Sequence, residues 1–360
     1  MKKSLKISQL AKKKSKKLPG PAPYTLNKDK STPKLLEYGV PQGSLLGPLF
    51  YILYTKEIEN IVKTHGMQLH MYADDCQIYI SLDSQCNKTS ENKIKDCLSS
   101  IKNWMDRSYL KLNPSKTNLI LIKLKCALNL PIFNLEFNGC VVEPAKSVMS
   151  LGVNISENLN FTSFISKKIQ ICSYHLRNLF HIRNALPFQT RVVLVTNLVL
   201  SNIDYCNSLL VGATDKDLKP LQRIINKSVR FIFNLKKRDH TSPFLFKLHF
   251  LSIRYRIQFK VNLIAFKIIN RMSPGYLSEE LKMFTPTTQI NLRLGQGRDN
   301  YMLEYPSMKF ENKSLVSKMV FLWNRLPYNI RTVQSILEFK SKLKTHLFRL
   351  AYPQYVNQSP

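Results

Sequence analysis

Residues 69–80 read LHMYADDCQIYI, and this stretch places a tight acidic turn between two short alternating segments. Apolar residues occupy every second position on both sides of the turn. Alternation with a period of two is typical of strands that bury one face. Because only residues 72–76 separate the two segments, the pattern predicts an antiparallel hairpin with Asp74 and Asp75 at its tip.

The adjacent carboxylates of Asp74 and Asp75 repel each other, and a turn does not need two acidic residues. A divalent cation would relieve the repulsion and would accept the oxygens as hard ligands. Polymerases hold Mg²⁺ at such turns, where the metal activates the primer hydroxyl and clamps the transferring phosphate. Asp-Asp pairs are also common in solvated turns, so the dipeptide alone leaves both interpretations open.

A second motif precedes the hairpin. Residues 39–44 read GVPQGS and lead into an apolar segment that begins after Pro48, which predicts a helix. Two glycines in this loop suit a backbone that passes close to a ligand, and Gln42 and Ser44 add hydrogen-bonding groups. The alternative is an ordinary helix-entry loop, which the order of loop, helix and acidic hairpin makes the weaker interpretation.

The loop and the acidic turn together resemble two core motifs of reverse transcriptases, in the form found in non-LTR (LINE-type) retrotransposons. The resemblance runs from Gly39 to about Tyr352. It is carried further by residues 104–105 (WM), 112–117 (LNPSKT), 151–153 (LGV), 176–178 (LRN), 204–209 (DYCNSL), 221–222 (LQ), 322–327 (LWNRLP) and 343–348 (LKTHLF).

This resemblance implies an RNA-directed DNA polymerase that uses Mg²⁺, an RNA template and a DNA primer. It makes Asp74 a catalytic metal ligand and Asp75 a neighbour with a weaker role. The other roles that it implies are the nucleotide and template side for Gln42, Gly43 and Ser44, the leaving phosphates for Lys116, and the primer grip for Leu151, Gly152 and Val153. Lys116 has an alternative of similar weight, as one of many surface lysines.

The expected fold class is α+β: a partial polymerase palm that carries the catalytic hairpin, then a mainly helical thumb and carboxy-terminal region. Apolar residues recur at helical spacing from Phe164 to Phe180 and in several later segments. The expected divisions are residues 1–38 as a basic, proline-containing disordered arm, 39–158 as the partial palm, 159–285 as the helical thumb, and 286–360 as a partly helical extension.

The charge of the chain indicates a polyanionic partner. The 360 residues include 54 Lys or Arg and 23 Asp or Glu, a formal net charge of +31, and residues 1–17 contribute only eight lysines to it. Such a surface attracts nucleic acid, with an anionic membrane surface or simple solubility as alternatives. The candidate phosphate contacts in the helical part are Lys167, Lys168, Arg177, Arg183, Arg223, Lys227 and Arg230.

Cysteine usage and hydropathy indicate the compartment. The seven cysteines are odd in number, and no two are separated by only two residues, which argues against a disulfide framework and against a zinc module. No apolar run is long enough to span a membrane, and the amino terminus has no apolar signal core. We expect an intracellular protein of the nucleus, the cytoplasm or both.

The sequence ahead of the GVPQGS loop lacks an expected feature. The family takes a further catalytic carboxylate from an earlier strand, but residues 1–38 contain only Asp29 and Glu37 as acids. We therefore expect this first motif to be absent, residues 1–38 to lie outside the family pattern, and the chain to bind nucleic acid without polymerising. Two alternatives are a non-catalytic nucleic-acid-binding remnant and a translated relic without function.

Overall fold

The computed structural model describes residues 3–7, 10–12, 21–22, 25–26, 29–30, 34–35, 45–81, 87–113, 116–122, 135–137, 140–279, 281–283, 301–305 and 314–356. The chain divides into two compact units, Met1–Asn160 and Phe161–Pro360. The first unit combines strands and helices, and the second is helical apart from one isolated bridge. The expectation of a mixed α+β protein is therefore confirmed at this level, while the division into palm and thumb stays a prediction.

The first unit carries fourteen strands and three helices among its described residues. They are β1 (Lys3–Ile7), β2 (Leu10–Lys12), β3 (Pro21–Ala22), β4 (Thr25–Leu26), β5 (Asp29–Lys30), β6 (Lys34–Leu35), α1 (Gly47–Thr55), α2 (Glu57–Thr64), β7 (Gln68–Tyr72), β8 (Asp75–Ile80), α3 (Asn87–Arg107), β9 (Leu110–Leu112), β10 (Thr117–Leu119), β11 (Leu135–Phe137), β12 (Cys140–Val142), β13 (Ser147–Ser150) and β14 (Val153–Ser156).

The main sheet of this unit has the order β10-β1-β8-β7, with all neighbouring strands antiparallel. Strand β1 pairs with β8 from Lys3 opposite Ile80 to Ile7 opposite Cys76. Strand β1 differs from the disordered arm expected over residues 1–38, most of which lie outside the described residues. Residues 4–7 do alternate in polarity, but the surrounding lysines dominate the composition, and pairing with strands far along the chain decides the outcome.

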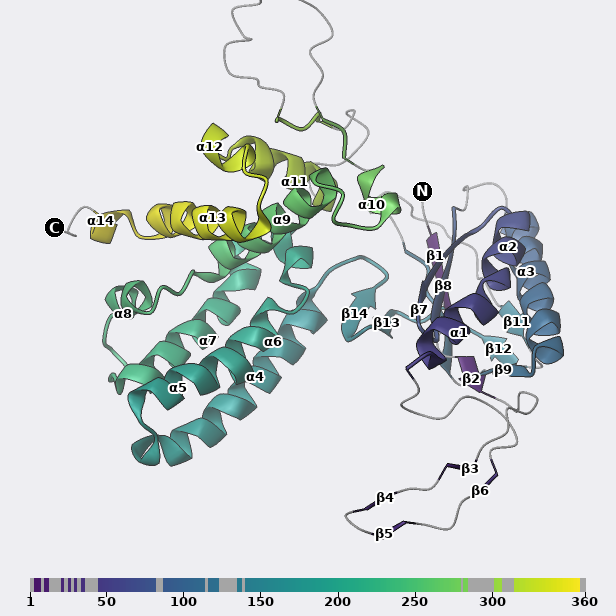
Figure 1. Ribbon diagram of the computed structural model, residues 1–360, viewed down its shortest axis with the longest axis horizontal. Coiled ribbons are helices and arrows are strands. Elements are labelled where there is room, and N and C mark those ends of the chain that lie inside the picture. Colours follow the sequence, from purple (N-terminus) through teal and green to yellow (C-terminus); the bar gives the residue numbers. More distant parts are fainter. Residues whose placement is uncertain are drawn as a thin grey trace, which may run out of the picture. The chain divides into compact units, whose positions relative to one another are not determined.

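Helices α2 and α3 lie side by side against the sheet and complete the core of the unit (Figure 1). Val62 of α2, Leu98 of α3 and Ile78 of β8 are each no more than 1% exposed and belong to one apolar cluster. In α3 the buried positions recur every three or four residues, so one helix face enters the core. The alternating residues of β8 meet this face, and the packing fixes the register of the hairpin that carries the acidic turn.

The second unit is built from helices. They are α4 (Thr162–Ile182), a 3-10 helix (Arg183–Ala185), α5 (Phe188–Val195), a π-helical segment (Thr196–Leu200), α6 (Ser201–Asp204), a second 3-10 helix (Asn207–Gly212), α7 (Asp215–Phe233), α8 (Ser242–Lys247), α9 (Ile253–Ile269), α10 (Gly275–Ser278), α11 (Leu315–Asn324), α12 (Tyr328–Arg331), α13 (Ile336–Ala351) and α14 (Pro353–Val356). None of the helices in the described ranges is both long and apolar enough to cross a membrane.

Helices α4 and α7 pack along each other through their apolar stripes, and α9 lies against α7, α11 and α13 (Figure 1). Helix α7 starts at a capping box, in which Thr214 and Asp217 satisfy each other's backbone N–H groups. It ends at Asn234, whose left-handed backbone, with φ of +58°, stops the helix. The predicted helical stripes of this region are confirmed, and their buried residues form the core of the helical unit.

Candidate functional site

The acidic turn lies at the tip of the β7–β8 hairpin. Tyr72 pairs with Asp75 as the last rung of the ladder, so the turn contains only Ala73 and Asp74. Ala73 adopts φ of +52°, a left-handed conformation that is unfavourable for a residue with a Cβ atom. Asp74 is exposed, and Asp75 is half-buried as the first residue of β8. The predicted hairpin is confirmed, and both carboxylates stand at its tip.

The acidic turn lies close to two buried groups in the core of the unit. Burial, together with smaller contributions from the charges of Asp75 and Asp74, raises the pKa of the Cys76 thiol to about 12. Burial also raises the pKa of the Tyr51 hydroxyl on α1, with smaller contributions from Cys76 and Asp74. Both groups are therefore neutral near pH 7, so the negative charge of the turn is confined to the two aspartates.

The buried hydroxyl of Tyr51 has no hydrogen-bond partner among the described residues. We expect Tyr51→Phe to stabilise the protein by about 1 kcal/mol, because it removes a buried polar group that folding leaves unsatisfied. Tyr54 is the matched control, because its hydroxyl donates to the backbone oxygen of Ser108 at 2.5 Å, so Tyr54→Phe should destabilise. Urea unfolding followed by circular dichroism measures both changes, and equal effects from the two variants would contradict this account.

A second turn lies in the β13–β14 hairpin, which contacts strand β8. Ser150 pairs with Val153 in the β13–β14 hairpin, and Leu151 and Gly152 form the turn with φ of +45° and +76°. The glycine suits this conformation, whereas Leu151 is strained and 42% exposed, and Val153 is buried. These three residues form one hairpin tip, as the implied primer grip requires, and that role stays a prediction.

A hydrogen bond that the sequence did not reveal joins the two hairpins. The Gln77 Nε2 atom in β8 donates to Ser150 Oγ at 2.6 Å. The Tyr79 hydroxyl in turn donates to Gln77 Oε1 at 2.5 Å, which holds the amide in place. The only available signal was the polar character of the residues that alternate with Ile78, which does not specify a partner.

Of the remaining predicted site residues, three lie outside the described residues and one lies within them. Gln42, Gly43 and Ser44 are the three outside, and their roles stay predictions. Lys116 is exposed immediately before β10, and its backbone N–H donates to the Asn113 oxygen at 3.2 Å. An exposed ammonium group at this position is compatible with both interpretations of Lys116.

Asp74 and Asp75 are the residues that fit a hard cation in this unit. An exposed and a half-buried carboxylate on adjacent residues offer the oxygens that Mg²⁺ prefers. Within the described ranges, no group of three or more His, Cys, Asp or Glu side chains is placed to hold a metal ion. The two aspartates therefore fit one side of a magnesium site, and the remaining ligands would come from substrate, water or residues outside these ranges.

The basic residues of the helical unit divide into exposed and buried groups. Lys167, Arg177, Arg223 and Lys227 are exposed, as contact with phosphate requires. Lys168 is only 6% exposed, and its Nζ donates to the Asn202 backbone oxygen at 2.5 Å. Burial lowers the pKa of Lys168. The prediction of Lys168 as a phosphate contact was therefore wrong, because helical periodicity turns it inward while its neighbour faces solvent.

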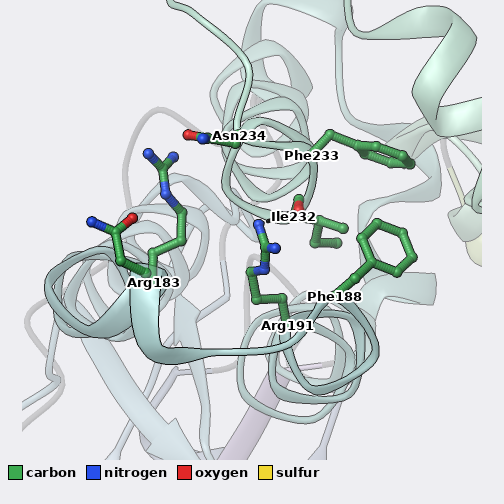
Figure 2. A pocket seen from close by; sticks show the side chains of 7 residues that line it. Arg183, Phe188, Arg191, Ile232, Phe233 and Asn234 are labelled. Atoms are coloured by element: carbon green, nitrogen blue, oxygen red, sulfur yellow. Dashed lines mark hydrogen bonds between the residues drawn. The ribbon is translucent and has the colours of Figure 1, made fainter.

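A small basic pocket of about 290 Å³ lies where α4 and α5 meet the end of α7. Figure 2 shows Arg183 and Arg191 on the wall of this pocket, with Arg191 hydrogen-bonded to the backbone of Ile232. The Arg191 Nη1 atom donates to that carbonyl oxygen at 2.8 Å, so Arg191 caps the carboxy-terminal end of α7. Arg183 instead lies over the Phe180 ring, at 5.4 Å from its centroid.

Lys227 of α7 lies over the same Phe180 ring, at 5.7 Å from its centroid. Arg183, Lys227 and Phe180 thus form a compact surface group, which we call the Phe180 cluster. Two cations that share one aromatic ring concentrate positive charge at this end of the unit. No hydrogen bond or ion pair occupies either cation among the described residues.

Comparison with known families identifies the first unit. The family model described as "Reverse transcriptase (RNA-dependent DNA polymerase)" matches residues 5–155, which include the acidic turn and the β13–β14 hairpin. Residues 5–155 are a reverse transcriptase domain. The match begins inside β1, so the expectation that residues 1–38 lie outside the family pattern was wrong. Strand β1, at the start of this stretch, is part of the four-stranded sheet of the reverse transcriptase domain.

The domain has distant homologues among the RNA-directed DNA polymerases of non-LTR retrotransposons. The chain is 26% identical over 209 residues to the probable RNA-directed DNA polymerase from transposon X-element of Drosophila melanogaster. It is 27% identical over 156 residues to that of transposon BS of the same species, and 28% identical over 138 residues to the Pol polyprotein of element R1 of Bradysia coprophila. These alignments cover 56%, 41% and 38% of this chain. They cover only 22%, 17% and 13% of the three relatives, respectively.

Proposed function

We propose that this chain carries the acidic turn of an RNA-directed DNA polymerase, and that alone it binds nucleic acid without extending a primer. The observation that supports the first part is the two-residue turn with Asp74 and Asp75 at its tip, inside the reverse transcriptase domain. The net positive charge of the helical unit supports the binding of nucleic acid.

In the proposed polymerase, Asp74 and Asp75 would hold Mg²⁺, and the ion would supply a lowered pKa of the primer hydroxyl and charge neutralisation on the transferring phosphate. The protein's own contribution is to fix the two carboxylates. The short turn holds them at the end of β8, and the buried core beneath the turn prevents the strand from shifting. The bond from Gln77 to Ser150 ties β8 to the hairpin assigned to the primer.

The proposed inactivity of the chain alone rests on the strand next to the turn. Strand β1 pairs with β8 and reads KSLKI, with no carboxylate. The family pattern takes its further catalytic aspartate from an earlier strand, and residues 1–38 contain only Asp29 and Glu37 as acids. Two carboxylates without this third one would bind the cation weakly and leave the nucleotide unpositioned.

Primer extension tests this proposal. The full chain and its Asp74→Ala/Asp75→Ala variant are each given a DNA primer on an RNA template with Mg²⁺ and deoxynucleotides. We expect no extension by either protein and salt-dependent binding of the primer-template by both. Extension by the wild type that the variant loses would overturn the claim of inactivity, and would show that another carboxylate completes the metal site.

The charge distribution also favours a second function, a nucleic-acid-binding module that does not use the turn. Residues 161–360 hold 31 of the 54 basic residues and 10 of the 23 acidic ones, a formal net charge of +21. Charge of this size supports binding of any nucleic acid through its phosphates, with little sequence preference. In this case the Asp74→Ala/Asp75→Ala variant binds as well as the wild type.

Within the helical unit, we expect the Phe180 cluster to contribute most to the binding of nucleic acid. Replacing Arg183 and Lys227 by Gln should lower the slope of log affinity against log salt by about two, one for each lost phosphate contact. Fluorescence anisotropy with a labelled RNA-DNA duplex at several salt concentrations measures this slope. The control, Lys216→Gln/Lys219→Gln, removes the same charge from exposed positions at the other end of α7. Equal effects from the two pairs would mean that the cluster is ordinary surface charge.

A further inference from the structure

A second pocket in the helical unit is unconnected with any function derived above. It has a volume of about 630 Å³ and lies between the π-helical segment Thr196–Leu200, the residues that follow α6, and one face of α9. Residues 204–208, from the DYCNSL motif, line it. A π-helical turn inserts a residue into a helix and is frequent at binding sites. Cys206 adds a left-handed backbone with φ of +54°.

An ion pair builds one wall of this pocket. The Arg256 guanidinium donates from Nε to Asp204 Oδ1 at 2.9 Å and from Nη2 to Asp204 Oδ2 at 2.6 Å. Both side chains are largely buried, with 14% and 26% exposed. The two parallel bonds fix the carboxylate and hold the turn after α6 against α9.

Asn207 presents an unsatisfied acceptor in the same wall. This side chain is 1% exposed, and its Nδ2 donates to Asp204 Oδ1 at 3.2 Å. Because the Asp204 carboxylate can only accept, the amide nitrogen must face it, and this fixes the orientation of the amide. The Asn207 Oδ1 atom is then buried without a partner. A buried acceptor of this kind costs free energy unless a donor reaches it, which points to a ligand with an N–H or O–H group.

Three other side chains on the pocket wall lack a hydrogen-bond or ionic partner among the described residues: Asn197, Ser208 and Lys260. The Lys260 ammonium is the only cation on this wall, within the residues described, that is not already paired, because Arg256 is committed to Asp204. An unpaired ammonium beside amide and hydroxyl groups suits a ligand that carries an anion together with hydrogen-bonding edges.

We propose that this pocket binds a single nucleotide. The phosphate meets Lys260, and an N–H of the base or an O–H of the ribose donates to Asn207 Oδ1. Asn197 and Ser208 bind the remaining polar edge. The volume lies within the range of sites that enclose ligands of this size. The nucleotide comes either from an unstacked position of an RNA strand or from free solution, and the two sources share this chemistry. The site is distinct from the acidic turn and does not depend on it.

Cys206 provides a reporter at the site. It lines the pocket and is partly exposed, whereas Cys76, Cys97 and Cys172 are buried. The test is the rate at which iodoacetamide alkylates Cys206 in the full chain, read by peptide mass spectrometry. It is measured without ligand and with AMP, GMP, CMP, UMP, an eight-nucleotide RNA, or inorganic phosphate. At a nucleotide concentration about ten times its Kd, alkylation should slow about tenfold.

Variants distinguish nucleotide binding in this pocket from non-specific attraction to the positive charge of the unit. The protection factor, which is the ratio of the rates without and with ligand, is compared within each protein. Lys260→Met should weaken nucleotide binding at least about tenfold, the usual effect of losing a charge-assisted hydrogen bond. Ser208→Ala is a second, milder variant. Lys216→Met, which removes an exposed charge elsewhere in the unit, should leave protection unchanged, and so should Asp74→Asn/Asp75→Asn.

Each outcome bears on the proposal. Protection by mononucleotides that Lys260→Met abolishes supports a site for free nucleotide. Protection by the RNA alone, lost in the same variant, supports a site for a nucleotide of a strand. The proposal is overturned if no nucleotide or RNA protects Cys206, if inorganic phosphate protects equally well, or if Lys260→Met and Ser208→Ala both keep full protection.

Discussion

Phe339→Ala is expected to lower the free energy of unfolding of the helical unit by about 3–5 kcal/mol, the usual cost of removing a fully buried phenyl ring. Phe339 of α13 is 0% exposed and lies between two other rings. Its centroid is 4.2 Å from that of Phe266 and 5.8 Å from that of Trp323, with both pairs stacked. The ring therefore joins α9, α11 and α13, and the cavity left by Ala cannot be closed by moving one helix.

The control is Leu337→Ala, two residues earlier on the same helix, where the side chain is 74% exposed. That change should alter the free energy of unfolding by less than about 0.5 kcal/mol. Urea unfolding followed by circular dichroism compares the two variants with the wild type. A loss for Phe339→Ala no larger than that for Leu337→Ala would mean that α13 does not pack on α9 and α11 in solution.

Local sequence pattern predicted the elements of both units well. The stripe from Phe164 to Phe180 became α4, and the alternating residues beside the acidic turn became β7 and β8. In both cases the periodicity reports a buried face directly, since recurring apolar residues of the stripe such as Phe164, Cys172 and Leu176 are buried. Strand β1 could not be found in this way, because its place in the sheet depends on strands β8 and β10 far along the chain.

In the candidate site too, local features could be predicted from the sequence and long-range contacts could not. The carboxylates of Asp74 and Asp75 were recognised because two adjacent acids in a short turn are chemically unusual. The bond from Gln77 to Ser150 was not, because 73 residues separate the two side chains and nothing local specifies the pairing. Lys168 was misplaced for a related reason: its charge predicted exposure, but its position on α4 buried it. The type of a residue predicts its usual exposure, whereas its actual burial and hydrogen-bond partners depend on tertiary packing.

Asp204→Asn should destabilise the helical unit by about 2–3 kcal/mol, somewhat less than the cost of breaking a fully buried ion pair because Asp204 and Arg256 keep slight contact with solvent. The variant leaves the Arg256 guanidinium charged and largely buried without its partner. The pair between Arg254 and Asp215 is the control, since both of its side chains are exposed, and Asp215→Asn should cost less than about 1 kcal/mol.

A double variant separates the loss of the ion pair from the cost of leaving the Arg256 charge unpaired. Arg256→Met in the Asp204→Asn background removes the unpaired charge, so the double variant should be more stable than Asp204→Asn alone. Urea unfolding of all four proteins, wild type included, gives the coupling free energy. A double variant that is less stable than either single variant would show that the two side chains act independently. The ion pair would then not be what holds the turn after α6 against α9, and the wall of the nucleotide pocket would need another support.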